Sequence, residues 1–112
     1  MRVFVTRTLP GKALDRLRER GLQVEVHRGL FLPREELLRR VEGAVGLIPT
    51  VEDRIDAEVM DRAKGLKAIA CYSVGVDHVD LEAARERGIR VTNTPGVLTE
   101  ATADLTLALL LA

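Results

Sequence analysis

The chain has 112 residues, of which 17 are Lys or Arg and 17 are Asp or Glu, so its formal net charge is zero. This length accommodates one domain with a hydrophobic core and not two, and the balanced charge argues against a nucleic-acid binder, which needs a basic excess to neutralise phosphates. With 46% apolar and 30% charged residues the composition excludes a disordered chain, and no apolar run approaches the ~20 residues of a membrane span.

The cysteine content and the N-terminus bear on the compartment. Cys71 is the one cysteine, so no disulfide can form within the chain. The first residues lack the apolar segment and the cleavage site of a signal peptide, and we expect a reducing, cytoplasmic setting. The chain has one Asn, one Gln and one Ser among many charged residues, which is typical of thermophilic proteins, although a GC-rich gene gives the same Arg-heavy composition.

Four glycines divide the chain into similar units. They are Gly21, Gly43, Gly65 and Gly88, so the intervals are 22, 22 and 23 residues. Each glycine follows a charged amphipathic stretch and precedes a short apolar one. Glycine commonly follows the last turn of a helix because it adopts the left-handed conformation without steric cost. Each unit therefore predicts a helix, a glycine and a strand.

The expected strands are short and rich in Val, Ile and Ala, as is typical of parallel strands buried on both faces. They cover Arg2–Thr6, Gln23–His27, Ala44–Pro49, Lys67–Tyr72 and Arg90–Asn93. The expected helices alternate with them and cover Pro10–Arg20, Pro33–Glu42, Asp56–Lys64, Asp80–Arg87 and about Thr99–Ala112.

Helical spacing of apolar residues supports these helices. The apolar sets are Ala13, Leu14 and Leu17, then Leu37, Leu38 and Val41, then Val59, Met60 and Ala63. Pro10 and Pro33 suit helix starts, and Asp56 and Asp80 are expected N-caps. Strict alternation predicts an α/β protein of flavodoxin-like fold, with a five-stranded parallel sheet of order 2-1-3-4-5 and helices on both faces.

Several functions that this fold supports need motifs that the sequence lacks. No G-x-G-x-x-G and no G-x-x-x-x-G-K-[ST] occurs, so the dinucleotide and P-loop signatures are missing. The first strand ends in Thr6-Arg7 and the third in Pro49-Thr50, without the acidic cluster with which a phosphoacceptor domain holds Mg²⁺. One Tyr, two Phe and no Trp leave few aromatic rings to stack on a flavin.

Three residues that often carry chemistry receive structural interpretations. Cys71, His27 and His78 lack the paired spacing of a zinc site, and no third group orients His78 as a base for a nucleophile. We interpret Cys71 as a buried strand residue and His27 as the side chain that ends an interior strand. His78 is interpreted as a residue at a helix entry.

Ligands of such folds bind at the carboxyl ends of the strands, and two loops there stand out. Around Gly75, consecutive N–H groups and the Ser73 hydroxyl can form a nest for a small carboxylate; the alternative is an ordinary strand-to-helix turn. After Pro95-Gly96, Thr99 can cap a helix whose N-terminus attracts a phosphate, with Thr102 donating a hydroxyl. Here the alternative is a capped helix without a ligand.

These two segments carry a family resemblance. KAIACYSVGVDH (Lys67–His78) and GIRVTNTPGVLTEATAD (Gly88–Asp104) resemble the D-isomer-specific 2-hydroxyacid dehydrogenases. The glyoxylate/hydroxypyruvate reductase (glycerate dehydrogenase) branch is closest in appearance, and the resemblance covers the whole chain. It implies the N-terminal part of a flavodoxin-like substrate domain, in enzymes about three times this length in which a Rossmann domain follows.

The resemblance also implies roles for individual residues. The backbone amides of Val74 and Gly75, beside Ser73, would hold the substrate carboxylate. Val51, in the loop after the third strand, would line the same cleft. Thr102 and Val74 would approach the nicotinamide side or the phosphates of the cofactor.

The same resemblance places the family's catalytic Arg, Glu and His, and its glycine fingerprint, in the downstream domain. His78 would not be the catalytic histidine, and residues 1–112 would contain no catalytic residue and no metal site. We therefore expect no cofactor and no turnover for the isolated chain, and NAD or NADP in the parent enzyme. Two alternatives stay open: an excised or engineered scaffold without a ligand, and a small-carboxylate binding module.

The last expected helix bears on partners. The leucines of Thr99–Ala112 lie almost all round the helix, and such a surface does not stay in water. Either the helix folds back to complete the domain, or it pairs with a second chain in a homodimer. A small 2-oxo or 2-hydroxy acid, bound weakly, and the missing Rossmann domain are the other expected partners; nucleic acid and membrane are not expected.

Overall fold

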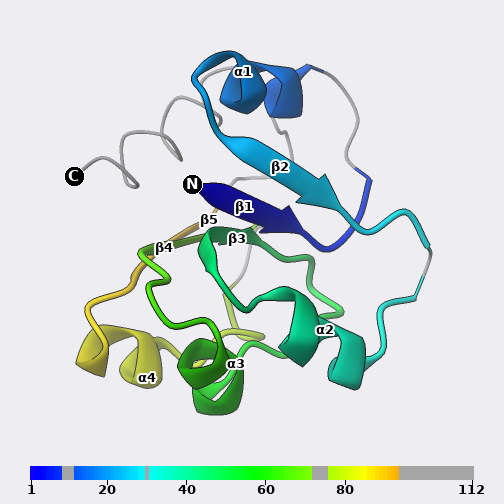
Figure 1. Cartoon of the computed structure of the whole chain (residues 1–112). Helices are drawn as coiled ribbons and strands as arrows, with labels where there is room; N and C mark the ends of the chain where they lie inside the picture. The colour runs from blue at the N-terminus through cyan, green and yellow to red at the C-terminus, as the bar shows by residue number, and fades with distance from the viewer. Residues whose placement is uncertain (9–11, 30, 72–75, 94–112) are drawn as a thin grey trace.

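The computed structural model describes residues 1–8, 12–29, 31–71 and 76–93 (Figure 1). Its elements, in chain order, are β1 (Arg2–Val5), α1 (Ala13–Glu19), β2 (Gln23–Val26), α2 (Arg34–Arg40), β3 (Ala44–Ile48), α3 (Ala57–Arg62), β4 (Ala68–Cys71), α4 (Leu81–Glu86) and β5 (Arg90–Asn93). The alternation of strand and helix is confirmed over these residues. The helix expected at Thr99–Ala112 lies outside the described residues, and so does the homodimer contact expected of it.

The sheet has five parallel strands in the order β2-β1-β3-β4-β5, which confirms the predicted flavodoxin-like topology. Val3 of β1 pairs with Val24 on one side and with Gly46 on the other. The chain therefore reverses its direction of winding at β1 and β3. In sheets of this kind the ligand site lies beyond the carboxyl ends of the strands at that switch point.

The four periodic glycines follow the ends of helices, as the sequence predicted. Gly21, Gly43, Gly65 and Gly88 all have positive φ, between 71° and 90°, which is the conformation that ends a helix and directs the chain into the next strand. Since four of the five strands are entered in this way, the glycine spacing accounts for the regularity of the fold.

Helix starts differ in their capping. Asp56 and Asp80 are N-caps as predicted, with carboxylates that accept hydrogen bonds from Val59 N (3.2 Å) and Ala83 N (3.0 Å). The first helix was expected from Pro10, but α1 begins at Ala13. Lys12 precedes it with a non-helical backbone (φ −109°, ψ 10°) and makes no capping hydrogen bond with its side chain, and Pro10 itself lies outside the described residues.

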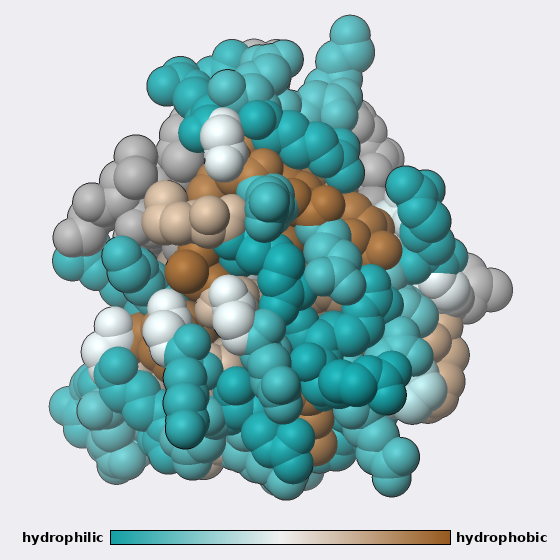
Figure 2. Space-filling model, viewed as in Figure 1, coloured by the Kyte–Doolittle hydropathy of each residue, from teal (hydrophilic) through white to brown (hydrophobic). Residues whose placement is uncertain are grey.

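Helices cover both faces of the sheet, with α1 on one face and α2, α3 and α4 on the other (Figure 1). The larger core lies under α2–α4 and centres on Phe4, Leu47 and Ile69, all at most 1% exposed. Leu17 of α1 packs on the opposite face, with Val3 and Val5 among its neighbours in the second core. Apolar residues show between hydrophilic ones on the face seen in Figure 2.

One expectation about burial is wrong. The central strands β1, β3 and β4 are buried on both faces, but β2 and β5 lie at the sheet edges and are only half-buried. His27 therefore follows an edge strand and not an interior one. The reason is topological, because the order 2-1-3-4-5 leaves the second and fifth strands with one neighbour each.

A group of charged side chains, here called the β2–α2 clamp, ties this edge to the helix beside it. Its members are Arg2, Glu25, His27, Glu36 and Arg40. Arg40 donates to Glu25 Oε1 (3.0 Å) and to Glu36 Oε2 (3.0 Å). Its guanidinium also lies over the ring of Phe4, 4.7 Å from the centroid, so the clamp reaches the core through a cation–π contact.

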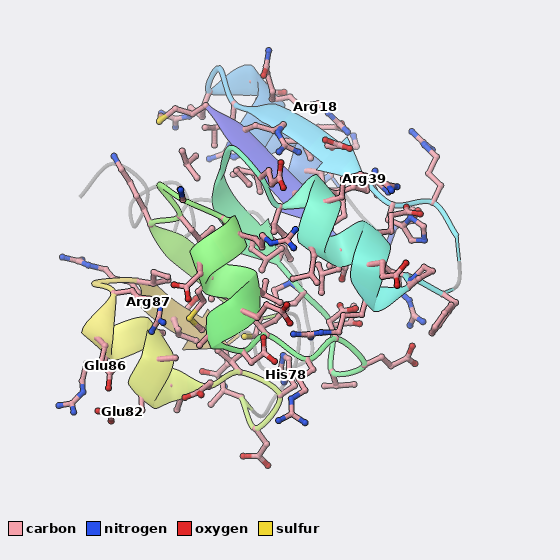
Figure 3. The ribbon with its side chains drawn as sticks, turned by 60° about the horizontal axis from the view of Figure 1, so that its bottom comes forward. Arg18, Arg39, His78, Glu82, Glu86 and Arg87 are labelled. Atoms are coloured by element: carbon pink, nitrogen blue, oxygen red, sulfur yellow. The ribbon has the colours of Figure 1, made fainter. Side chains whose placement is uncertain are left out.

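Charged side chains otherwise project from the outer sides of the helices, as Arg18, Arg39, Glu82 and Glu86 do in Figure 3. Their ion pairs are exposed, and such pairs contribute little stability. No helix among the described residues is both long enough and apolar enough to cross a membrane.

Candidate functional site at the carboxyl edge of the sheet

The switch point brings together polar residues from two segments that lie far apart in the sequence. Thr6 follows β1, and Thr50 and Asp53 follow β3, the strand beside it. Asp53 Oδ2 accepts hydrogen bonds from Thr6 Oγ1 (2.5 Å), Thr50 N (2.8 Å) and Thr50 Oγ1 (3.2 Å). We call this group the switch-point anchor.

The anchor closes a tight turn. Asp53 N donates back to Thr50 O (3.1 Å), and the fully buried Pro49 leads into the turn from β3. Val51 occupies the middle of the turn and is 62% exposed. The loop therefore presents an apolar side chain to solvent at the carboxyl edge of the sheet, where ligands of such folds bind.

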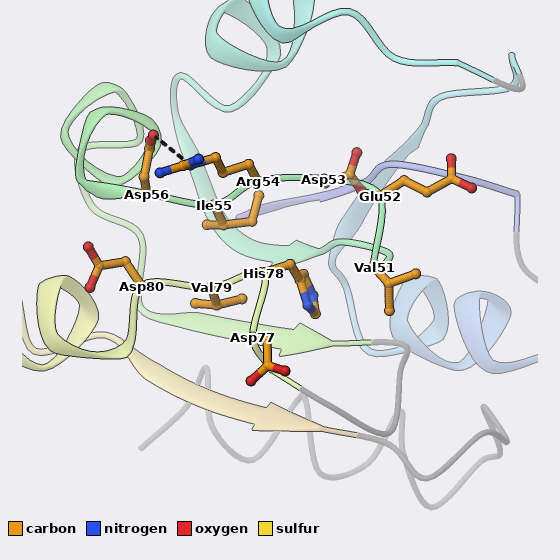
Figure 4. Close-up of a pocket in the computed structure, with 10 residues that line it drawn as sticks. All are labelled: Val51, Glu52, Asp53, Arg54, Ile55, Asp56, Asp77, His78, Val79 and Asp80. Carbon is orange, nitrogen blue, oxygen red and sulfur yellow. Dashed lines mark ion pairs between the residues drawn. The ribbon is translucent and has the colours of Figure 1, made fainter.

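A hollow of about 520 Å³ opens between residues 51–56 and residues 77–80 (Figure 4). A short parallel bridge joins the two segments: Ile55 N donates to His78 O and Asp80 N donates to Ile55 O, both at 2.9 Å. The two bridged segments follow β3 and β4, which are neighbouring strands of the sheet. The hollow between these segments therefore lies at the carboxyl edge of the sheet.

Carboxylates dominate the lining of this hollow. Among the described residues that line it, Glu52, Asp53, Asp56, Asp77 and Asp80 stand against one cation, Arg54, whose Nε lies 3.8 Å from Asp56 Oδ2. Such a lining repels an anion, so an acidic ligand here needs N–H donors from residues outside this lining. The residues predicted to supply them, Ser73, Val74 and Gly75, lie outside the described residues, as does Thr102.

His78 lies in the hollow, in the segment before α4 (Figures 3 and 4). Burial lowers the pKa of its imidazole, and the nearby carboxylates of Asp53 and Asp77 only partly oppose that shift, so the pKa lies below 6.5. This environment therefore favours the uncharged form of the ring. Its Nε2 is buried and has no hydrogen-bond partner among the described residues.

His27 has a different setting. Its Nδ1 lies 2.9 Å from Arg40 Nη1 and its Nε2 lies 2.9 Å from Phe31 O. A guanidinium can only donate, so Nδ1 accepts and Nε2 carries the hydrogen that goes to the carbonyl. Both ring nitrogens are engaged within the fold, which supports the structural interpretation of this histidine.

Cys71 at the end of β4 is fully buried, and burial raises the pKa of its thiol to about 11. A protonated thiol is a poor nucleophile, so the structural interpretation of Cys71 holds as well. Within the described ranges, no three His, Cys, Asp or Glu side chains are grouped so that they could hold a metal ion.

The sequence analysis did not single out Thr6, Thr50 and Asp53, and the role that it predicted for Val51 stays a prediction. A usable signal was present: Thr6 and Thr50 follow strands that the predicted order makes neighbours, and an aspartate stands three residues after Thr50. The two threonines are also the buried polar residues of the described core, at 4% and 8% exposed. Burial of that kind requires hydrogen-bond partners.

Comparison with known proteins supports a single family. The model of the D-isomer specific 2-hydroxyacid dehydrogenase catalytic domain matches residues 3–108. Among curated proteins, the chain is 50% identical over 113 residues to a glyoxylate reductase of Thermofilum pendens and 46% identical over 112 residues to one of Pyrococcus furiosus. Each match covers 99% of this chain and 33% of the relative, so the chain spans about a third of the length of these proteins.

Solved structures agree. The TT0316 protein of Thermus thermophilus is 94% identical, with a TM-score of 0.84 over 100% of this chain and 36% of that one. An NAD⁺-bound 3-phosphoglycerate dehydrogenase of Entamoeba histolytica is 28% identical, with a TM-score of 0.73 over 86% of this chain and 33% of that one. The predicted resemblance is confirmed: the chain belongs to the D-isomer specific 2-hydroxyacid dehydrogenase family and corresponds to its catalytic domain.

Proposed function

We propose that this domain binds the carboxylate of a small 2-oxo acid, glyoxylate or hydroxypyruvate, inside an NAD(P)-dependent 2-hydroxyacid dehydrogenase. The identity of 46–50% to glyoxylate reductases over 99% of the chain is the observation that carries the proposal. Val51, exposed at the carboxyl edge of the sheet, supports a site at that edge, whereas the acidic lining of the hollow alone disfavours an anion. Amides of Val74 and Gly75, with the Ser73 hydroxyl, would supply the donors that the acidic lining lacks.

We also propose a division of labour between two domains. Residues 1–112 would form one flavodoxin-like substrate domain, and a Rossmann domain in the rest of the polypeptide would hold NAD or NADP. The curated relatives are about three times as long as this chain, which leaves room for such a domain. Bound nicotinamide would supply the hydride, while Thr102 and Val74 would contact the cofactor from this side.

The described residues fit a binding role better than a catalytic one. The imidazole of His78 is neutral with its Nε2 buried, and the thiol of Cys71 is protonated. Neither group is prepared to donate a proton to a substrate at neutral pH. Residues 1–112 alone would therefore orient a 2-oxo acid without reducing it.

The test compares the full-length enzyme that carries this domain with residues 1–112 alone. We expect the full-length enzyme to oxidise NADH or NADPH when glyoxylate or hydroxypyruvate is added, and the isolated chain to show no oxidation. Turnover by the isolated chain would refute the division of labour. A full-length enzyme that reduces neither acid would refute the substrate assignment.

A further inference from the structure

We propose that Asp53 is a positioning residue for the substrate site, which fixes the turn of residues 50–53 through Thr6 and Thr50 and thereby sets the place of Val51. The inference rests on the proposed function, since Val51 matters only if this edge binds the substrate. Asp53 itself need not touch the substrate, and its effect passes through the turn.

The first support is the hydrogen bonding of one oxygen. Asp53 Oδ2 accepts from two hydroxyls and one backbone N–H, on residues that follow two adjacent strands. An ionised carboxylate accepts several hydrogen bonds and makes them stronger than a neutral acceptor does. Three donors on one atom define where the turn lies relative to both strands.

The second support is burial. Thr6 and Thr50 are 4% and 8% exposed, and they are the buried polar residues among those described. Thr6 N also donates to Ile48 O (3.1 Å), which extends the pairing of β1 with β3 by one bond. The sheet thus fixes the position of Thr6, the hydrogen bond from Thr6 fixes the carboxylate of Asp53, and this carboxylate fixes the turn.

The third support is the contrast inside the turn itself. Val51 is 62% exposed although it lies two residues from Asp53, and the neighbouring carboxylate of Glu52 forms an exposed ion pair with Arg7, at 3.2 Å. An exposed ion pair of long side chains fixes a position poorly. The buried anchor is therefore the feature that keeps the apolar side chain directed outward.

The test uses Asp53→Ala and Asp53→Asn in the full-length enzyme, with Glu82→Gln, at an exposed carboxylate of α4 outside the hollow, as the control. We expect Asp53→Ala to raise the KM for glyoxylate about tenfold while kcat changes less than about threefold and the KM for the nicotinamide cofactor stays the same. Asp53→Asn should give an intermediate rise, because an amide oxygen can accept but carries no charge. Glu82→Gln should change each constant less than about twofold.

A double-mutant cycle checks that Asp53 acts through the threonines. Thr6→Val and Thr50→Val together should raise the KM for glyoxylate several-fold, and adding them to Asp53→Ala should add little. An unchanged KM for glyoxylate in Asp53→Ala would overturn the proposal. A fall in the apparent kcat with both KM values unchanged would also overturn it, since that pattern indicates a loss of folded enzyme.

A structural readout separates this proposal from the proposed function. In ¹³C-labelled protein, Asp53→Ala should shift or broaden the methyl signals of Val51, whereas Glu82→Gln should leave them in place. Unmoved methyl signals would overturn the positioning role of Asp53. Moved signals in an enzyme that reduces neither acid would instead show that the substrate assignment is at fault.

Discussion

The switch-point anchor and the β2–α2 clamp both tie strand ends to their neighbours, but they are built from different side chains. The anchor uses three short residues, two of them buried, and three hydrogen bonds on one oxygen. The clamp uses long side chains that keep 13–40% of their surface exposed. Short buried groups define a position, while long half-exposed ones stabilise a contact without fixing it tightly.

Their locations explain the difference. The clamp lies at an edge strand, where its task is to hold β2 and α2 together. The anchor lies where β1 and β3 meet, at the edge of the sheet that faces the ligand hollow. Changes in the anchor should therefore affect both local stability and the site, and changes in the clamp should affect stability alone.

The largest effect is expected from breaking the anchor. Asp53→Ala leaves two buried hydroxyls and one N–H without their acceptor, and each such group costs about 1–3 kcal/mol. We expect a loss of about 3 kcal/mol for opening of this region, measured by native-state hydrogen exchange of the Thr50 amide in the full-length protein. Equal protection of this amide in the variant and the parent would contradict the anchor's role.

A smaller effect is expected from breaking the clamp. Arg40→Ala removes its ion pairs with Glu25 and Glu36 and the contact with the Phe4 ring, and we expect a loss of about 1–2 kcal/mol. The loss should appear as faster exchange of the His27 amide, which donates to Val5 O, and it should shrink at high salt because salt screens half-exposed charges. The KM for glyoxylate should not change. A higher KM would remove the functional contrast between the two groups.

The smallest expected effect concerns how stability depends on pH. It compares His78, which lines the hollow beside the switch-point anchor, with His27, a member of the β2–α2 clamp. The pKa of His78 is lowered in the folded protein, so the unfolded chain takes up the proton first as the pH falls. Its contribution to stability is complete above pH 6.5 and is lost between pH 6.5 and the lower folded-state pKa. We expect less than about 1 kcal/mol, because the ring is only partly buried.

His78→Gln should flatten the dependence of the unfolding midpoint on pH between about 5 and 7, as followed by urea titration. His27→Gln is the matched control, and its own pH dependence should retain the component that His78 contributes. An unchanged pH profile in His78→Gln would show that the imidazole of His78 is not the group that titrates.

Much of the fold could be predicted because local signals agreed with one another. The glycine interval marked each helix end, Asp56 and Asp80 marked two helix starts, and the strict alternation fixed the sheet order. The predictions were wrong where local signals are weak. Pro10 suggested an early start for α1, and the common apolar character of the strands concealed that β2 and β5 are edges.

The site was harder to predict, because its parts meet only in the folded sheet. Thr6 and Asp53 are 47 residues apart, and an aspartate in a turn after a strand is common in any protein. The role of Val51 was predicted from the family resemblance, not from a property of valine, and it stays a prediction. The roles of Ser73, Val74, Gly75 and Thr102 stay predictions, which the kinetic experiments on the full-length enzyme can test.

The central position of β1 has a consequence for synthesis on the ribosome. Because β1 precedes both of its neighbours in the chain, β2 can cover one of its edges early, but the other edge stays open until residues 44–48 arrive. Until then Val3, Phe4 and Val5 lack half of their cover, and Thr6 lacks the Asp53 acceptor for its hydroxyl. A nascent chain that has not yet extended past Asp53 therefore cannot form the switch-point anchor, and the central strand waits for β3 before its core is covered.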